Sequence, residues 1–299
     1  MSWLQLRLDT HPDQVAQLEE LMLASGAVAV TMEDNADQPV LEPGVGETPL
    51  WNHTRLTGLY PADSDMDAAL AQFPPALLAQ CNQRIEILED KDWEREWMQH
   101  YQPMRFGRRL WVCPSWIEPP EPDACNLLLD PGLAFGTGTH PTTAMCLAQL
   151  DNMALAGTRM VDYGCGSGIL AAAALKLGAE RALGVDNDPQ ALAASRDNCA
   201  RNHIDQQRLQ LALPGEAVIG DWHGQAEVVV ANILAGPLLQ LRDTLLDLLQ
   251  PGGSLMLAGL LESQAGELIE HYRPRITLEV ADQVEEWVCL RSTSDAQAL

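Results

Sequence analysis

A glycine-rich turn between an apolar strand and a helix constrains this chain more than any other feature. Residues 162–168 read DYGCGSG, after the short run 159–161 and before an Ala- and Leu-rich helix expected to reach Gly178. Glycines at alternate positions let the backbone approach a bulky ligand, where a Cβ atom would collide. The free N–H groups at a helix start also suit an anion. Asp186, at the end of the next apolar run, is placed to accept hydrogen bonds from two ribose hydroxyls, so the pattern predicts a nucleoside cofactor site.

The glycine spacing distinguishes between kinds of nucleoside. A dinucleotide site requires G-x-G-x-x-G, but Ile169 stands at the third glycine position. No G-K-[ST] follows, which excludes a triphosphate P-loop. A G-x-G-x-G turn with an acid two residues ahead resembles the first motif of class I methyltransferases, which implies S-adenosylmethionine. A turn without a ligand and a nicotinamide-dependent dehydrogenase stay open as alternatives.

Composition limits the classes of partner. The 299 residues are 46% hydrophobic, with 42 acidic and 18 basic residues and a formal charge of −24. This charge argues against binding of nucleic acid through its phosphates and favours a basic partner. An acidic surface that only increases solubility is the alternative. Seven scattered cysteines without a C-x-x-C pair predict neither a metal cluster nor disulfides. With no long apolar stretch and no signal-like start, we expect a soluble, cytoplasmic monomer without a metal, membrane or nucleic-acid partner.

The chain is expected to hold two domains joined by a helix. Residues 1–88 follow the order strand, helix, strand, strand, helix, strand, which suggests a ferredoxin-like α+β domain. That domain has 13 acidic and 3 basic residues, and its second helix is expected over 65–73. Residues 89–103 read as a charged linker helix. Its Trp93 and Trp97 share a face, as anchors between domains or as contacts for a partner.

The remaining residues, 104–299, predict a doubly wound α/β domain, because apolar strands alternate with helices. A separate strand is expected at 110–113, and Asp188 and Pro189 begin a helix as N-cap and first residue. A leucine stripe over 238–248 predicts one further helix. The last two strands are expected to form an antiparallel hairpin that turns near Asp282. The strands are expected near 159–162, 181–186, 208–212, 227–231, 254–258, 275–281 and 284–290.

Two further segments carry candidate chemistry. Residues 130–143 (DPGLAFGTGTHPTT) predict a mobile lid followed by a helix whose first turn presents Thr142 and Thr143 to the cofactor. His140 is a candidate base, although a histidine beside a helix start is more often structural. Asn232 ends the fourth strand of the α/β domain, at the edge where doubly wound sheets hold ligands. Its amide oxygen is placed to accept a hydrogen bond from an attacking amine, and the alternative is a turn-capping asparagine.

At this point the chain resembles a known family over nearly its whole length. The runs LDPGLAFGTGTHPTT, VDYGCGSGILA, GVDNDPQA and VVANILAGPL are similar to those of PrmA, the bacterial methyltransferases of large-subunit ribosomal protein eleven. The resemblance implies trimethylation of lysine ε-amines and of the N-terminal α-amine of that protein. It also implies that Thr143, Gly164, Asp186 and Asn232 contact S-adenosylmethionine and that the N-terminal domain recognises the substrate. From its position and its amide oxygen, we expect Asn232 to be the catalytic residue. The third-strand end, ALPG at 212–215, offers no acid for the adenine amino group. A small-molecule or RNA methyltransferase and a catalytically silent binding module remain alternatives.

Overall fold

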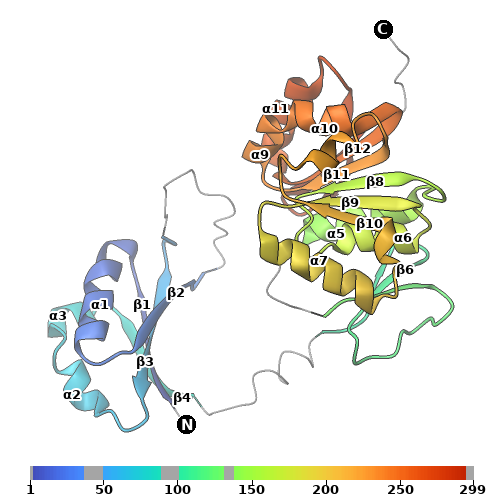
Figure 1. Cartoon of the computed structure of the whole chain (residues 1–299). Helices are drawn as coiled ribbons and strands as arrows, with labels where there is room; N and C mark the ends of the chain where they lie inside the picture. The colour runs from blue at the N-terminus through green and yellow to red at the C-terminus, as the bar shows by residue number, and fades with distance from the viewer. Residues whose placement is uncertain (1–2, 37–49, 89–100, 131–137, 294–299) are drawn as a thin grey trace. The chain divides into compact units, whose positions relative to one another are not determined.

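The computed structural model describes residues 3–36, 50–88, 101–130 and 138–293. The chain forms two compact units, Met1–Gln99 and His100–Leu299 (Figure 1). The expected linker helix over 89–100 and the expected lid over 131–137 lie outside the described residues.

The first unit is a four-stranded antiparallel sheet in the order β2-β3-β1-β4, with helices packed against it (Figure 1). Leu6 and Leu8 alternate with polar residues along β1, so they face the helices and pack with Val15, Leu18 and Met22. This arrangement confirms the ferredoxin-like prediction. The elements are β1 (Trp3–Thr10), α1 (Pro12–Ala24), β2 (Ala29–Asp34), β3 (Thr54–Pro61), α2 (Met66–Leu70), α3 (Pro75–Leu78) and β4 (Asn82–Leu88).

The second helix of this unit is shorter than predicted. Asp65 caps α2 by accepting hydrogen bonds from the N–H groups of Asp67 and Ala68, but the helix ends at Leu70. A separate helix, α3, starts at Pro75. Two consecutive prolines explain the break, because a proline disfavours helical geometry in the residue before it.

The second unit contains a seven-stranded sheet in the order β10-β9-β8-β11-β12-β14-β13. All neighbours are parallel except β14, which runs antiparallel to both β12 and β13. One buried cluster joins α5, α6 and α7 to one face, and another joins α9, α10 and α11 to the opposite face (Figure 1). The predicted doubly wound sheet with a hairpin edge is therefore confirmed.

The bounds of the second unit follow in chain order. The elements are β5 (Met104–Phe106), β6 (Leu110–Cys113), β7 (Cys125–Leu128), α5 (Pro141–Asn152), β8 (Arg159–Tyr163), α6 (Ile169–Lys176), β9 (Arg181–Val185), α7 (Pro189–Arg201), a 3-10 turn (Gln206–Arg208), β10 (Leu209–Ala212), α8 (Ala217–Gly220), β11 (Ala226–Asn232), α9 (Ala235–Gln240), α10 (Arg242–Leu248), β12 (Leu249–Leu261), α11 (Glu262–Tyr272), β13 (Leu278–Val284) and β14 (Trp287–Ser292). Strands β5, β6 and β7 form a separate small sheet, of which only β6 was predicted.

Two predictions in this unit differ from the structure. The leucine stripe is divided at Leu241, whose φ of −89° and ψ of 2° end α9 before α10 begins. The stripe still packs on the sheet, since Leu238, Leu245 and Leu248 are fully buried. The final hairpin turns at residues 285–286 and not near Asp282, because Val284 pairs directly with Trp287.

Candidate active site

Three glycines at alternate positions of the turn follow β8 and shape the site. Gly164, Gly166 and Gly168 have φ values of 79°, 53° and 73°, a left-handed backbone that favours glycine. A Cβ atom on Gly164 would lie 2.2 Å from Cγ2 of Ile233, and one on Gly168 would lie 2.7 Å from Oγ of Ser195. Both conformation and space therefore require glycine, and the turn ends at the N-terminus of α6, as the sequence predicts.

Asp186 joins this turn to the end of the neighbouring strand β9. Its Oδ2 accepts a hydrogen bond from the Gly166 N–H at 2.8 Å, and its Oδ1 accepts one from the Asp188 N–H at 3.0 Å. Each carboxylate oxygen has a second lone pair, so the side chain retains capacity to accept two hydroxyl donors. Asp188 in turn caps α7 by accepting from the Gln190 N–H at 2.8 Å, as predicted.

Asp162 is a buried carboxyl group beneath the glycine turn. Its Oδ2 accepts a hydrogen bond from the Ala171 N–H at 3.1 Å, whereas its Oδ1 has no partner among the described residues. Burial raises the pKa of Asp162 to about 7, and the charge of Asp186 acts in the same direction against the Ala171 hydrogen bond. An incompletely satisfied buried carboxyl group beside a ligand turn is suited to face a positively charged ligand group.

Asn232 and Thr143 meet at the same edge of the sheet. Asn232 ends β11, and its Nδ2 donates a hydrogen bond to Oγ1 of Thr143 at 3.2 Å. Thr143 lies in the first turn of α5 and is 1% exposed. With its nitrogen committed to Thr143, the Asn232 amide directs its oxygen as an acceptor for another group.

His140 has a structural position at the start of α5. Its Nδ1 accepts a hydrogen bond from the Thr142 N–H at 3.3 Å and lies 2.8 Å from Oγ1 of Thr142. Its ring also contacts that of Trp287 edge-on, with centroids 4.9 Å apart. Burial lowers the pKa of His140, which favours the neutral imidazole that a helix cap requires. These contacts favour the capping interpretation over a general base.

All four predicted site residues lie at the carboxyl edge of the sheet, but they form two groups. Thr143 and Asn232 share a hydrogen bond, whereas Gly164 and Asp186 belong to the turns that follow β8 and β9. Gly164 also bridges the groups, since it packs against Ile233, the neighbour of Asn232. This edge of a doubly wound sheet is the usual place for a bound ligand.

Sequence reasoning missed two polar residues of α7 that hold the glycine turn. Ser195 donates a hydrogen bond to the Gly166 carbonyl at 2.9 Å, and Asn198 donates one to the Ser167 carbonyl at 2.8 Å. Both side chains are buried. The sequence pattern that could have identified them is two polar residues, three apart, on the inward face of a helix where apolar residues are expected.

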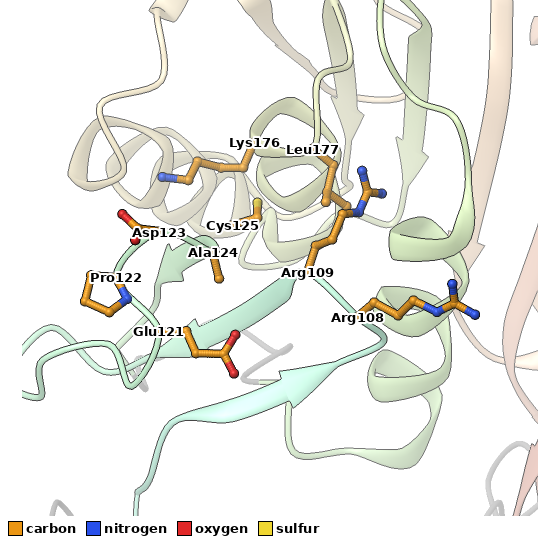
Figure 2. Close-up of a pocket in the computed structure, with 9 residues that line it drawn as sticks. All are labelled: Arg108, Arg109, Glu121, Pro122, Asp123, Ala124, Cys125, Lys176 and Leu177. Atoms are coloured by element: carbon orange, nitrogen blue, oxygen red, sulfur yellow. The ribbon is translucent and has the colours of Figure 1, made fainter.

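A cavity of about 630 Å³ is lined by none of the residues of that edge, and its lining side chains are shown in Figure 2. Its lining residues include Arg108, Arg109 and Lys176, and it adjoins the C-terminal end of α6, whereas the glycine turn adjoins the N-terminal end. Arg109 is already paired, because its Nε lies 3.3 Å from Oδ1 of the buried Asp151. The cavity is therefore separate from the candidate active site. Across the described part of the chain, no group of three His, Cys, Asp or Glu side chains is placed to hold a metal ion.

Comparison with known proteins decides the family. The model of the ribosomal protein L11 methyltransferase family, PrmA, matches residues 2–295. The chain belongs to this family. Similar relatives include the ribosomal protein L11 methyltransferases of Azotobacter vinelandii, 55% identical over 96% of this chain and 98% of the relative, and of Marinobacter nauticus, 51% identical over 97% and 98%. A crystal structure of the ribosomal protein L11 methylase from Lactobacillus delbrueckii subsp. bulgaricus matches with a TM-score of 0.56 and 30% identity, over 64% of this chain and 98% of that one.

Membership in the PrmA family identifies the chain as an S-adenosylmethionine-dependent protein methyltransferase. The alternatives of a nicotinamide-dependent dehydrogenase and of a turn without a ligand are thereby excluded. The site is consistent with this donor, because the turn leaves no room for side chains at Gly164 and Gly168 and the adjacent Asp162 retains an unpartnered oxygen. No helix in the described ranges is long and apolar enough to cross a membrane.

Proposed function

We propose that this enzyme methylates ribosomal protein L11 on lysine ε-amines and on its N-terminal α-amine, up to the trimethylated state. The observation that carries the proposal is the Asn232 amide, anchored by Thr143 at the carboxyl edge and free to accept a hydrogen bond from an amine. The names of the relatives support the substrate protein, and the acceptor geometry supports nitrogen as the methylated atom.

We propose Asp186, Gly164 and Thr143 as the residues that hold the cofactor, with Asn232 at the reacting end. Asp186 is suited to the ribose hydroxyls because its oxygens are fixed by two backbone N–H groups. Gly164 has no side chain, so the ligand can approach the backbone of the turn closely. Thr143 positions the Asn232 amide. When bound, S-adenosylmethionine supplies an electrophilic methyl group on a sulfonium.

The chain must also deliver the amine without its proton. A free lysine has a pKa near ~10.4, so deprotonation at pH 7 costs about 4.6 kcal/mol. His140 is occupied as a helix cap, and Asn232 is not a base. Removal of the amine from water lowers its pKa, and the Asn232 oxygen then orients the lone pair toward the methyl group. Alignment of this kind supplies up to roughly 7–11 kcal/mol of a barrier.

Repeated methylation requires space around the nitrogen atom. The residues before Asn232 and after Leu234 are the small Ala231 and Ala235, and both are buried. Leu234 between them is 52% exposed and adds an apolar surface. Small side chains at these two positions keep bulky groups away from the Asn232 amide, which supports successive transfers to one nitrogen.

We further propose that residues 1–88 recognise the substrate, that 89–103 link the domains and that 104–299 carry out the transfer. The first domain has 13 acidic and 3 basic residues, which suits a basic ribosomal protein and disfavours direct contact with nucleic acid. The enzyme would act as a monomer, in the cytoplasm where its substrate is made. Electrostatic steering predicts that association slows as salt rises from about 0.05 to 0.3 M.

The direct test is intact-protein mass spectrometry of unmethylated ribosomal protein L11 after incubation with the enzyme and S-adenosylmethionine. Methyl groups added in threes, mapped to lysine side chains and the N-terminus by peptide sequencing, support the proposal. No addition by an enzyme that still binds the cofactor would contradict the proposed substrate. Additions that stop at one methyl group would contradict trimethylation.

A further inference from the structure

Trp287 begins the last strand at the catalytic edge of the sheet. It pairs with Leu261, the final residue of β12, whereas Asn232 pairs with Ala258 of the same strand. Because β11 and β12 are parallel, their carboxyl ends meet at one edge, and the antiparallel β14 starts there. Trp287 is thus an aromatic residue on the edge that carries Asn232.

The same helix start contacts both residues. The Trp287 ring lies edge-on to His140, at 4.9 Å between centroids and an interplanar angle of 71°. His140 caps α5, and Thr143 in the first turn of α5 accepts the hydrogen bond from Asn232. Trp287 packs partly against the core beneath α5 and remains partly exposed. The indole therefore borders the N-terminus of α5 beside the proposed reaction site.

The backbone that presents Trp287 is held in an unfavourable conformation. Glu285 has a φ of 54°, one of two non-glycine residues with a positive φ in the described part of the chain. It forms with Glu286 the two-residue turn between Val284 and Trp287, at a position where glycine is usual. The Glu286 carbonyl accepts a hydrogen bond from the Glu262 N–H at 2.7 Å, which ties the turn to α11. The two-residue hairpin turn accounts for this φ and fixes the point at which β14, and with it Trp287, begins.

The turn also places acidic residues directly before Trp287 in the chain. Glu285 and Glu286 are exposed, and Glu262 at the start of α11 is exposed too. No salt bridge joins any of the three to a basic residue among the described residues. An aromatic ring bordered by carboxylates attracts a cation of low hydration, and methylated ammonium groups are of this kind.

We infer that Trp287 determines specificity for the alkylammonium side chain, holding mono- and dimethylated amines at the edge between transfers while Glu285 and Glu286 attract the cation. This inference rests on the proposed function, in which one nitrogen receives several methyl groups. A methylated amine is still protonated at neutral pH, so it leaves the site unless a surface retains it until the proton is lost again. A π-face retains it without blocking deprotonation.

The test compares Trp287→Phe, which keeps a ring, with Trp287→Met, which fills the space without one. Full-length enzymes act on an excess of unmethylated ribosomal protein L11, so that each substrate molecule binds an enzyme at most once. Mass spectrometry records the mono-, di- and trimethylated fractions. Trp287→Met is expected to raise KM for the protein about tenfold and to stall at mono- and dimethyl products. Trp287→Phe is expected to stay within about threefold of wild type, with cofactor Kd and melting temperature unchanged in both variants.

Trp116→Leu is the matched control, because Trp116 is exposed and lines a cavity with Arg201 and His203 at the C-terminal end of α7. It is expected to give wild-type products.

A second variant, Glu285→Gln with Glu286→Gln, is expected to raise KM while the product distribution stays that of wild type. A wild-type product distribution for Trp287→Met would overturn the inference. Equal changes in KM and product distribution in Trp287→Met and Trp287→Phe would also overturn it. Absence of any methylation by the wild-type enzyme would instead refute the proposed function.

Discussion

The Nδ2 atom of Asn232 donates a hydrogen bond to Oγ1 of Thr143 at 3.2 Å, across 89 residues of sequence. The bond joins the end of β11 to the first turn of α5 and fixes which way the amide points. An asparagine that was free to rotate by 180° would present its NH₂ group to the amine half of the time. The threonine therefore selects the orientation in which the amide oxygen is the acceptor.

Replacement of Asn232 by alanine should lower kcat by about 100-fold, the size of effect expected when a reacting group loses its alignment. Cofactor affinity should change by much less, because the ribose and turn contacts remain. Steady-state kinetics combined with calorimetric titration of S-adenosylmethionine would separate the two effects. Equal losses in rate and in affinity would assign Asn232 to cofactor binding alone.

Thr143 should act through Asn232. Thr143→Val removes the acceptor while preserving shape, so kcat should fall by about tenfold, the value of one lost hydrogen bond of about 1 kcal/mol or more. Thr143→Ser keeps the hydroxyl group and should retain most activity. If valine and serine variants were equally active, the hydrogen bond would have no role in orienting the amide.

Asp186→Ala should weaken cofactor binding by about 10- to 100-fold, consistent with the loss of charge-assisted hydrogen bonds of about 1.5–3 kcal/mol. The side chain accepts from the Gly166 and Asp188 N–H groups, so its removal also loosens the two turns that frame the site. Asp188→Ala is the control, because Asp188 caps α7 and its loss should cost about 1 kcal/mol of stability without a comparable loss of affinity. Unchanged affinity in Asp186→Ala would contradict the ribose assignment.

Strand ends and glycine turns are local patterns, so Gly164, Asp186 and Asn232 were placed at the correct edge of the sheet from sequence alone. The support for them is not local. Ser195 reaches the turn from α7, and Trp287 reaches α5 from the other end of the domain, through pairings that only the folded sheet creates. The protonation of Asp162 also depends on burial by the whole domain, which no spacing of residues reveals. The break at Leu241 shows the same limit, because the leucine pattern continues through a residue whose backbone leaves the helical conformation.

Gly164→Ala should destabilise the enzyme by two separate causes. Its new Cβ would lie 2.2 Å from Cγ2 of Ile233, and its φ of 79° is strained for alanine. Ile233→Ala in the same chain removes the contact but not the backbone strain of about 1–2 kcal/mol, so it should restore part of the stability. Urea unfolding of the single and double variants measures this coupling. If the two substitutions were strictly additive, the close approach of the turn to Ile233 would not be what requires glycine.

Asp162 should make the stability of the cofactor-free enzyme depend on pH. Its pKa is raised by burial from 3.8 to about 7, so the native state keeps a proton that the unfolded chain releases. The unfolded state therefore binds fewer protons between about pH 4 and pH 7, and this contribution to stability falls as pH rises through that window. Above about pH 7 the native carboxyl group is ionised as well, and the dependence ends.

Asp162→Asn removes this titration, since an amide oxygen can still accept from the Ala171 N–H without ionising. The variant should lose the fall in unfolding free energy between about pH 4 and pH 7 and should be at least as stable as wild type at pH 8. Its affinity for the positively charged cofactor should be lower and nearly independent of pH, whereas wild-type affinity should rise as Asp162 ionises near pH 7. Urea unfolding and cofactor titrations at several pH values measure both quantities. Parallel pH profiles of the two proteins would mean that the buried carboxyl group does not titrate in this range.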